Sequence, residues 1–456
     1  MSTIPLIHCS AHDHVGKSVA WKTLSWSEDD TPEQLLSEEE KASDIDHLIP
    51  QSKRKYQVRD ILADHFADYC RSHKVSDEKR KVIHSLMSCK TGELGYTMAR
   101  CPDCGFVQLR PCSCGNRNCP SCGVLAEKKW VEERQAEVIP GIPYFHLVFT
   151  LPHQLTPVIY LNQKKVLDLL FHSVKDTILD LSRDRLKIIP GVLKVLHTFG
   201  SNLSLHYHLH VLVSGGGLAL DKKTFKRCMA SRFFLPVKAV SSLYRGKFLD
   251  GLKQLRDKGK LQYEGEIQKY RNSYEWKKEL LDPCYKADWN VEIKYLSPAV
   301  STGHHSPDET TSNAIQYFAR YTNRTAISDS RILDHKDGNV RFRYKKYDGS
   351  AYEWKVLDLT ADEFIRRFLT HILPAGFTKV RSCGYLAGCV RAKNLALIYS
   401  LLKEEFHPSP VKTMSSAELI EYFYDEPAGQ CPECDHRLEI FPRLSREEVW
   451  KHIRAA

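Results

Sequence analysis

Apolar residues along this chain recur with two different periods, which predicts a mixture of helices and strands. Between residues 53 and 87 they stand three and four apart, as on the buried face of a helix. Short alternating or continuous apolar runs predict strands instead. The expected helices are 53–87, 124–138, 161–181, 313–322 and 362–372, and the expected strands are 144–151, 192–199, 205–213, 289–295, 340–347 and 352–357. We therefore expect an α+β fold with helices packed on an antiparallel sheet.

The strand predicted at 205–213 carries a histidine at every second position, namely His206, His208 and His210, and three glycines follow it. Because side chains alternate across a strand, the three imidazoles share one face. A cation bound opposite that face would explain the pattern. The alternative is a polar edge strand whose histidines face water.

Composition narrows the class of protein. The chain has 456 residues, of which 42% are hydrophobic and 27% charged, as in a globular protein of two or three domains. No apolar stretch has the length needed to cross a bilayer, and residues 1–13 lack the basic and apolar blocks of a signal peptide. We therefore expect a cytoplasmic protein.

The net charge of +10 is unevenly distributed. Residues 1–50 contain ten Asp and Glu against three Lys, a balance of −7, and we expect them to form an acidic, mobile leader. Residues 51–456 therefore carry +17. A basic body of this size favours an anionic partner, and nucleic acid is the leading candidate.

Fifteen cysteines in a cytoplasmic protein indicate metal binding rather than disulfides. Cys101-x-x-Cys104 and Cys119-x-x-Cys122 are separated by fourteen residues, close to the spacing of paired knuckles that hold one tetrahedral zinc ion. Four thiolates leave no open coordination position, so the predicted site is structural. The alternative is a set of free buried thiols.

Further cysteines leave the number of zinc ions open. Cys89, Cys112 and Cys114 lie in the same segment, and Cys431 and Cys434 form a CxxC near the C-terminus. They either contribute to a second zinc site or have no role as ligands, and spacing does not decide between these. Arg100, Arg110 and Arg117 flank the zinc-binding module. Zinc knuckles with such neighbours commonly contact nucleic acid, and we expect DNA binding here, although many knuckles bind protein or only brace a fold.

Two tyrosines stand four residues apart in the helix predicted at 313–322. Tyr317 and Tyr321 would share one face of that helix, with Arg320 and Arg324 beside them. Two phenols next to two guanidiniums would suit attack on a phosphate and its clamping. Ordinary packing of a half-buried helix explains the same spacing.

Taken together, these residues predict a reaction. A divalent cation held by His208 and His210 could polarise a scissile phosphate. A tyrosine oxygen could then displace the sugar oxygen and leave a covalent phosphotyrosine, and a second tyrosine could hold a second strand end. His206 lies further along the strand, and we do not expect it to reach the same ion.

At this point the chain resembles a known family, the two-tyrosine HUH transposases of rolling-circle insertion sequences, typified by insertion sequence ninety-one. The resemblance runs from about residue 56 to residue 439. Its blocks, in the family's order, are Ser113-Cys114-x-Asn116-Arg117-x-Cys119-Pro120-x-Cys122, Phe145-His146-Leu147-Val148-Phe149-Thr150-Leu151-Pro152-His153, His206-x-His208-Leu209-His210 with Gly215-Gly216-Gly217-Leu218, Tyr317-x-x-x-Tyr321-x-x-Arg324, and Glu363-Phe364-Ile365-Arg366-Arg367-Phe368 through Leu373-Pro374-x-Gly376-Phe377.

The resemblance implies an HUH-type sheet and a transposase that nicks and rejoins single-stranded DNA at the ends of a mobile element. Tyr317 and Tyr321 would be the nucleophiles, each forming a 5′-phosphotyrosine. His208 and His210 would bind Mg²⁺ or Mn²⁺, and zinc would be structural. Arg320, Arg324 and Arg117 are the residues expected to bind DNA.

The sequence departs from the family pattern at two positions. Asn118 and Asn323 stand where the family has histidine. The first could alter the zinc module, with Cys112 as a substitute ligand. The second leaves the third ligand of the catalytic ion open, and the candidates are Gln316, Asn323, His206 and His304.

The predicted domains are the leader 1–50, a helical segment with a small cysteine-rich zinc-knuckle domain at 51–138, the catalytic domain at 139–400, and a C-terminal tail with a lone CxxC at 401–456. Two other functions stay open at this stage. One is a metal-dependent nuclease that uses water and forms no covalent adduct. The other is a zinc-knuckle DNA-binding protein whose histidines only pack.

Overall fold

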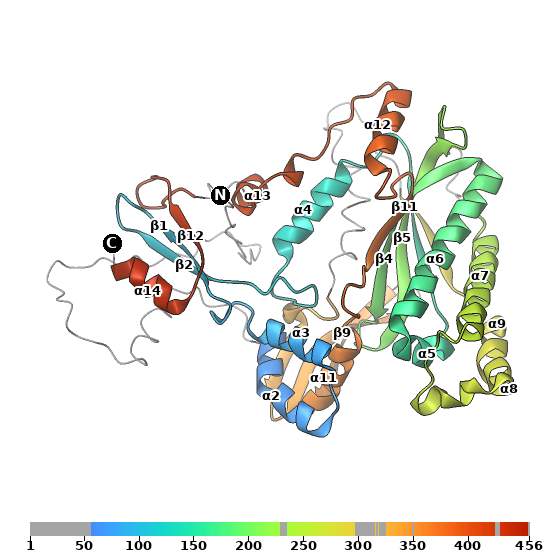
Figure 1. Cartoon of the computed structure of the whole chain (residues 1–456), viewed down its shortest axis with the longest axis horizontal. Coiled ribbons are helices and arrows are strands. Elements are labelled where there is room, and N and C mark those ends of the chain that lie inside the picture. The colour runs from blue at the N-terminus through green and yellow to red at the C-terminus, as the bar shows by residue number, and fades with distance from the viewer. Residues whose placement is uncertain are drawn as a thin grey trace.

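The structure is a computed structural model that describes residues 56–228, 235–296, 315, 318, 325–348, 351–424 and 429–454. Within these residues the chain has the predicted α+β fold, with helices around an antiparallel sheet and two smaller sheets beside it (Figure 1). None of the described helices is both long enough and apolar enough to cross a membrane.

The main sheet has its strands in the order β11-β4-β5-β3-β7, and β6 pairs with β5 outside that row. Every pair in it is antiparallel. The strands are β3 (Tyr144–Thr150), β4 (Ile188–Phe199), β5 (Leu205–Ala219), β6 (Phe225–Arg227), β7 (Val291–Leu296) and β11 (Val380–Gly384). This order places the histidine strand β5 in the middle of the sheet, with a neighbour on each side, so it is not the edge strand of the alternative reading.

Strand β5 continues past its predicted end at residue 213, through the three glycines. Gly217 pairs with Pro190 of β4, and a Cβ atom added at Gly217 would lie 2.4 Å from the carbonyl oxygen of Ile189. Only glycine lets the two backbones approach this closely. Glycines here permit a strand to continue, where the sequence pattern indicated a stop.

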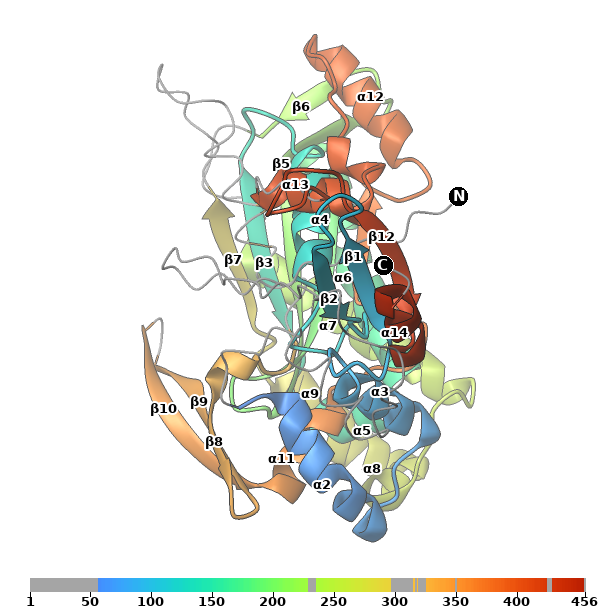
Figure 2. The same cartoon turned by 90° about the vertical axis from the view of Figure 1, so that its left-hand side faces the viewer.

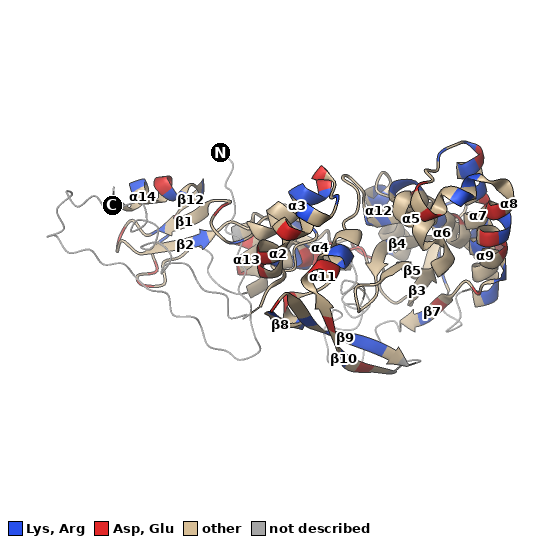
Figure 3. Ribbon diagram, turned by 90° about the horizontal axis from the view of Figure 1, so that it is seen from below, with Lys and Arg blue, Asp and Glu red and all other residues tan. Residues whose placement is uncertain are grey.

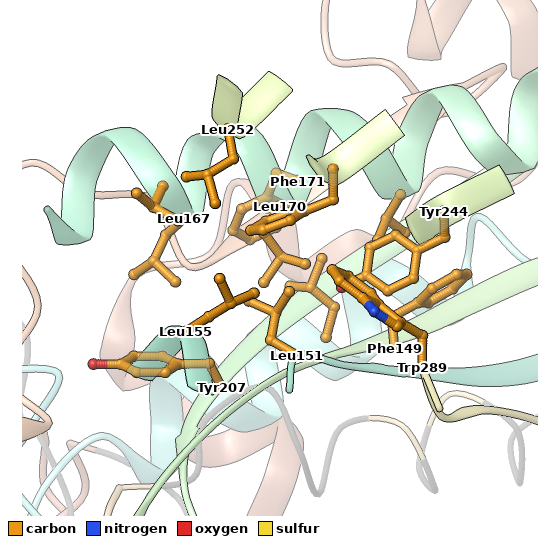
Figure 4. Close-up of a cluster of buried hydrophobic side chains, with 14 of the residues drawn as sticks. Phe149, Leu151, Leu155, Leu167, Leu170, Phe171, Tyr207, Tyr244, Leu252 and Trp289 are labelled. Atoms are coloured by element: carbon orange, nitrogen blue, oxygen red, sulfur yellow. The ribbon is translucent and has the colours of Figure 1, made fainter. Parts of the chain in front are cut away.

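One face of the main sheet is covered by two long helices, α6 (Gln163–Leu181) and α7 (Val237–Asp257). Leu170 and Phe171 of α6 pack against the sheet residues Phe149 and Tyr207 in a cluster of almost fully buried side chains (Figure 4). Burying each such side chain contributes about 1.5–3 kcal/mol. This core holds β3 and β5 in place on one face of the sheet. Their other face is free of α6 and α7.

The opposite face of the sheet carries the histidines. Val195 and Leu212 on this face pack with Ile398 of α12 (Arg391–Leu402) and with Ile315 and Phe318. Ile315 and Phe318 are both helical and buried, and they lie within the segment predicted as the tyrosine helix. These two residues therefore pack on the histidine face.

A second core lies at one end of the main sheet. There the helices α2 (Val58–Ser72), α3 (Asp77–Met87) and α11 (Ala361–Thr370) pack on a sheet of the order β10-β9-β8. Its strands are β8 (Ile332–Lys336), β9 (Asn339–Asp348) and β10 (Ala351–Thr360). Helix α11 begins where the Thr360 side chain accepts a hydrogen bond from the N–H of Glu363.

A third, small sheet stands away from the others (Figure 1). Its strands have the order β12-β1-β2 and lie nearest the viewer in Figure 2. It consists of β1 (Tyr96–Arg100), β2 (Val107–Pro111) and β12 (Glu439–Leu444), and α14 (Arg446–Arg454) covers it. The segment that the sequence presents as a tail thus supplies an edge strand to the cysteine-rich region. The predicted domain boundaries themselves stay a prediction.

Shorter helices complete the described chain. They are α4 (Val124–Gln135), α5 (Thr156–Leu161), α8 (Ser273–Glu275), α9 (Asp282–Lys286) and α13 (Ser416–Tyr424). Helix α4 connects the cysteine-rich region to the first strand of the main sheet, β3.

Candidate active site and metal centres

Three histidines meet on the face of the main sheet opposite α6 and α7. Two come from β5 and one from β4. The ligand atoms of His197, His208 and His210 lie within 4.8 Å of one another. The β4–β5 register places His197 directly opposite His208, and alternation places His210 one pleat further along the same face. All three are at least 91% buried, so their imidazoles line a closed site rather than an open surface. The group suits a divalent cation.

Hydrogen bonds orient two of these rings. The Nδ1 of His210 lies 2.9 Å from Nε2 of His146 on β3, and the Nδ1 of His208 lies 2.9 Å from the carbonyl oxygen of His206. With Nδ1 engaged in both rings, Nε2 is the nitrogen each offers to a metal. A metal-binding histidine commonly has such a partner on its other nitrogen.

Burial also sets the charge of this site. It lowers the pKa of His208 to about 4 and the pKa of His146 to about 4. Both imidazoles are therefore neutral at pH 7, which is the form that binds a metal ion.

The third histidine of the group, His197, was missing from the candidates for a third ligand. Of those candidates, His206 is exposed and outside the group, as its position on the strand predicted, while Gln316, Asn323 and His304 lie outside the described residues. The signal for His197 was present: strands 192–199 and 205–213 joined by a short turn form a hairpin. Pairing them in register brings residue 197 opposite residue 208.

The predicted nucleophiles Tyr317 and Tyr321, and the predicted phosphate-binding Arg320 and Arg324, lie outside the described residues. Their neighbour Phe318 is described. Its ring centroid lies 6.0 Å from that of His146 in an edge-to-face arrangement. Phe318 therefore contacts the residue that orients His210.

Eight of the described cysteines form two groups of four, and the predicted pairing of the two CxxC motifs in one site is wrong. Cys101 and Cys104 do not join Cys119 and Cys122. One group is Cys89, Cys114, Cys119 and Cys122, and the other is Cys101, Cys104, Cys431 and Cys434.

The reason is the β1–β2 hairpin, which lies between the two predicted pairs. Cys101 and Cys104 sit in its turn, while Cys119 and Cys122 follow its second strand. Strands of five residues separate the two ends by about 17 Å. Cys89 precedes the first strand and so joins the group at the base of the hairpin.

The base group is compact. The sulfurs of Cys114 and Cys122 lie 3.7 Å apart, and the backbone N–H of Cys114 donates to the sulfur of Cys89 at 3.4 Å. Cys112 belongs to neither of these groups. Asn118 faces Asn116, to whose side-chain oxygen its backbone N–H donates at 3.0 Å.

Arg117 has a role that the sequence did not indicate. Its guanidinium donates to the carbonyl oxygens of Leu373, Pro374 and Phe377, in the loop after α11. It therefore ties the base cysteine group to the loop after α11. Its contact with DNA stays a prediction.

A buried carboxylate makes a second such connection. Asp329 accepts a hydrogen bond from the hydroxyl of Ser121 at 2.7 Å and another from the N–H of Val58 at 3.0 Å. Asp329 thereby joins three segments: the cysteine turn, the first turn of α2, and the chain around residue 329 itself.

Comparisons with known proteins match two regions of the chain, one containing the base cysteine group and one containing the histidine group. Residues 191–394 match a family model described as a putative transposase, and residues 61–151 match one described as a transposase zinc-binding domain. Over 398 residues the chain is 36% identical to a putative transposase, y4qJ, of Sinorhizobium fredii, covering 84% of this chain and 95% of that protein. It is 26% identical over 410 residues to the transposase for insertion sequence element IS801 of Pseudomonas savastanoi pv. phaseolicola, covering 87% and 93%. No solved structure matches it.

Proposed function

This chain belongs to the transposase family in which a zinc-binding domain of insertion sequence ninety-one type precedes the transposase domain, and on that premise we propose that it nicks and rejoins single-stranded DNA at the ends of a mobile element. The observation that carries the proposal is the buried group His197, His208 and His210, on the face where the segment containing Phe318 packs.

The three histidines are the proposed ligands of a catalytic Mg²⁺ or Mn²⁺. Hydrogen bonds orient the imidazoles of His208 and His210, and that of His208 is neutral at pH 7, which fits a cation that needs fixed ligands on one side and open positions on the other. When bound, that ion would polarise the scissile phosphate.

Tyr317 or Tyr321 is the proposed nucleophile. Its phenolic oxygen forms a bond to phosphorus and loses its proton, and the bond from phosphorus to the 3′ oxygen of the neighbouring sugar breaks. That oxygen takes up a proton and leaves as a 3′-hydroxyl, so the tyrosine retains the 5′-phosphate. Attack by a 3′-hydroxyl of another strand end reverses the step and rejoins the DNA. The second tyrosine would hold the second end.

The test is a cleavage assay with purified full-length protein, labelled single-stranded DNA from the ends of its own element, and Mn²⁺. We expect a protein band that carries the label after denaturing electrophoresis. The double variant Tyr317→Phe/Tyr321→Phe should lose this band. Tyr274→Phe, at an exposed tyrosine far from the histidines, should keep it.

Two other outcomes separate the alternatives. Cleavage without a covalent adduct, unchanged in the double tyrosine variant, would favour a nuclease that uses water. Binding without cleavage by any element end, with any divalent metal, would favour a DNA-binding protein. The buried histidine group argues against that last function, because packing alone gives no reason to bury three imidazoles together.

A further inference from the structure

The two cysteine turns that meet in the small sheet have the same backbone structure. In each, the N–H of the first cysteine donates to the carbonyl five residues later, and the N–H four residues later donates to the first cysteine's carbonyl. The bonds are Cys101 N to Phe106 O (2.8 Å), Gly105 N to Cys101 O (3.2 Å), Cys431 N to His436 O (2.7 Å) and Asp435 N to Cys431 O (2.9 Å). These are two matching knuckles, one from each end of the described chain.

The sulfurs of the two turns face one another. The Cys101 and Cys434 sulfurs lie 3.4 Å apart, as do the Cys104 and Cys431 sulfurs, and all four lie within 4.8 Å of each other. Four thiolates about 2.3 Å from one zinc ion lie about 3.8 Å apart at the corners of a tetrahedron, whereas a disulfide needs about 2.05 Å. The separations fit a shared ion.

The surroundings hold the two turns in place. Strand β12 pairs with β1, with Arg100 opposite Glu439, and their side chains form a salt bridge of 3.1 Å just before the first knuckle. Cys101 and Cys431 are each 1% exposed and pack with Phe106.

We propose that Cys101, Cys104, Cys431 and Cys434 hold a second structural zinc ion, separate from the ion of the base group. The site closes the zinc-binding module with a knuckle that lies outside residues 61–151, the part matched to the zinc-binding family model. It joins positions 327 residues apart in the chain, Cys104 and Cys431. A metal bond over that separation removes much of the conformational entropy of the unfolded chain.

The test is the zinc content of the full-length protein by mass spectrometry of the metal. We expect two zinc ions per wild-type chain and one in Cys431→Ser/Cys434→Ser. Cys89→Ser/Cys114→Ser, in the base group, should also retain one. Cys389→Ser, at an exposed cysteine outside both groups, should retain two.

Zinc-edge X-ray absorption of the wild type needs no variant to fold, and it should show only sulfur ligands. A wild-type content of one ion, or two ions retained in Cys431→Ser/Cys434→Ser, would each overturn the second site.

An independent observation concerns the β9–β10 hairpin. Its inner face packs on α11, where the rings of Phe342 and Phe364 lie 6.0 Å apart. Its outer face leaves large aromatic side chains in solvent: Tyr347, Tyr352 and Trp354 are 61%, 50% and 49% exposed. A rigid strand pair that presents aromatic rings outward is unusual unless a ligand covers them.

Cations lie between these rings. The register places Lys345 opposite Trp354, and its ammonium lies 3.6 Å from the centre of the Tyr352 ring and 5.2 Å from that of Trp354. Arg343 lies 6.0 Å from the centre of the same tryptophan ring. Figure 3 shows Lys and Arg running along β9. Stacking rings with interleaved cations recognise the bases and phosphates of single-stranded nucleic acid.

The hairpin is attached to the turn between the two histidine-bearing strands. The hydroxyl of Ser201, in that turn, donates to the carbonyl of Lys345, and Arg331 donates to the carbonyl of Ser201. These bonds hold the β9–β10 hairpin next to the turn that joins the two histidine-bearing strands.

The geometry points to a binding platform for single-stranded DNA on the outer face of Arg343, Lys345, Tyr347, Tyr352 and Trp354. This platform rests on the proposed function and deepens it, because it holds the strand on which the tyrosines act. It reads base stacking and charge, so it tolerates many sequences.

The test is the affinity of the full-length protein for a fluorescent oligothymidylate without added Mg²⁺ or Mn²⁺, so that binding is measured apart from cleavage. Tyr352→Ala/Trp354→Ala should weaken binding about tenfold or more. Tyr160→Ala/Tyr274→Ala, which removes two exposed tyrosines elsewhere, should bind like wild type. A double-stranded competitor should displace the oligonucleotide poorly.

Unchanged affinity in Tyr352→Ala/Trp354→Ala would overturn the platform, as would equal loss in the control. The covalent adduct is scored separately with Mn²⁺. If the adduct forms but binding does not depend on Trp354, only the platform is overturned. If binding depends on Trp354 but no adduct forms, the platform is supported and the proposed chemistry is overturned.

Discussion

His146 stands beside His210, with its Nε2 2.9 Å from the Nδ1 of His210 and the two rings nearly parallel at 5.1 Å. Each comes from a different strand of the main sheet, β3 and β5. The contact fixes which nitrogen of His210 faces the cation site, so His146 is a positioning residue for that ligand.

Replacing His146 should therefore weaken metal binding without removing a ligand. We expect His146→Phe to lower Mn²⁺ affinity about 10–100-fold, measured by calorimetry, because His210 loses its orienting partner. Excess Mn²⁺ should restore much of the DNA cleavage. Unchanged affinity would mean that the contact between the two rings is only packing.

Loss of His197 should be more severe, because it removes a proposed ligand. His197→Ala is expected to reduce Mn²⁺ affinity on the order of 100-fold or more. The matched control is His206→Ala, at a histidine on the same sheet that is exposed and outside the group. If the two variants bound Mn²⁺ equally well, His197 would not be the third ligand.

Asp329 should matter for stability and for the base cysteine group. Asp329→Ala leaves the Val58 N–H and the Ser121 hydroxyl without their acceptor in a buried place, and such a loss costs about 2 kcal/mol or more. We expect a lower Tm and faster transfer of zinc to a chelator. Asp257→Ala, an exposed carboxylate at the end of α7, should change neither.

Stability should fall in mild acid, partly through His371. Burial lowers the pKa of His371 to about 4 from its ordinary 6.5, and both ring nitrogens are engaged, by Thr198 and by the carbonyl of Leu203. In the unfolded chain the imidazole of His371 is protonated below about pH 6.5, whereas in the folded chain it is protonated only below about pH 4. The stabilisation is thus complete above this window and is lost as pH falls through it.

Each such histidine contributes a slope of up to about 1.4 kcal/mol per pH unit inside the window. Urea unfolding of wild type at several pH values should show this decline. In His371→Leu the protein should be less stable at neutral pH and its slope should be smaller. An identical slope in the variant would assign the acid sensitivity to other groups.

Zinc removal gives a further prediction. Chelation should unfold the β12-β1-β2 sheet and expose Trp450 of α14, because the small hydrophobic cluster there has few buried residues of its own. The main sheet, with its separate core of α6 and α7, should keep its far-ultraviolet circular dichroism. Loss of all structure on chelation would contradict this independence.

Local periodicity was sufficient to predict four strands of the main sheet, β3, β4, β5 and β7, and the shared face of the β5 histidines, but it did not indicate β6 or β11. It could not assign His197, because that role depends on the register between two strands. It could not pair the cysteines either, since the β1–β2 hairpin separates neighbours in sequence and β12 returns from far away. In both cases the missing information is which segments lie side by side, and spacing along one segment does not contain it.

The pairing of β1 with β12 also sets an order of events during translation. The β1–β2 hairpin leaves the ribosome early, but its edge partner and the second pair of thiols are synthesised only near the other end of the chain. Until then β1 presents an unpaired edge, which favours association with other chains or with chaperones. A nascent or prematurely terminated transposase that lacks β12 therefore cannot complete this module. The module forms only after the chain has been synthesised through β12.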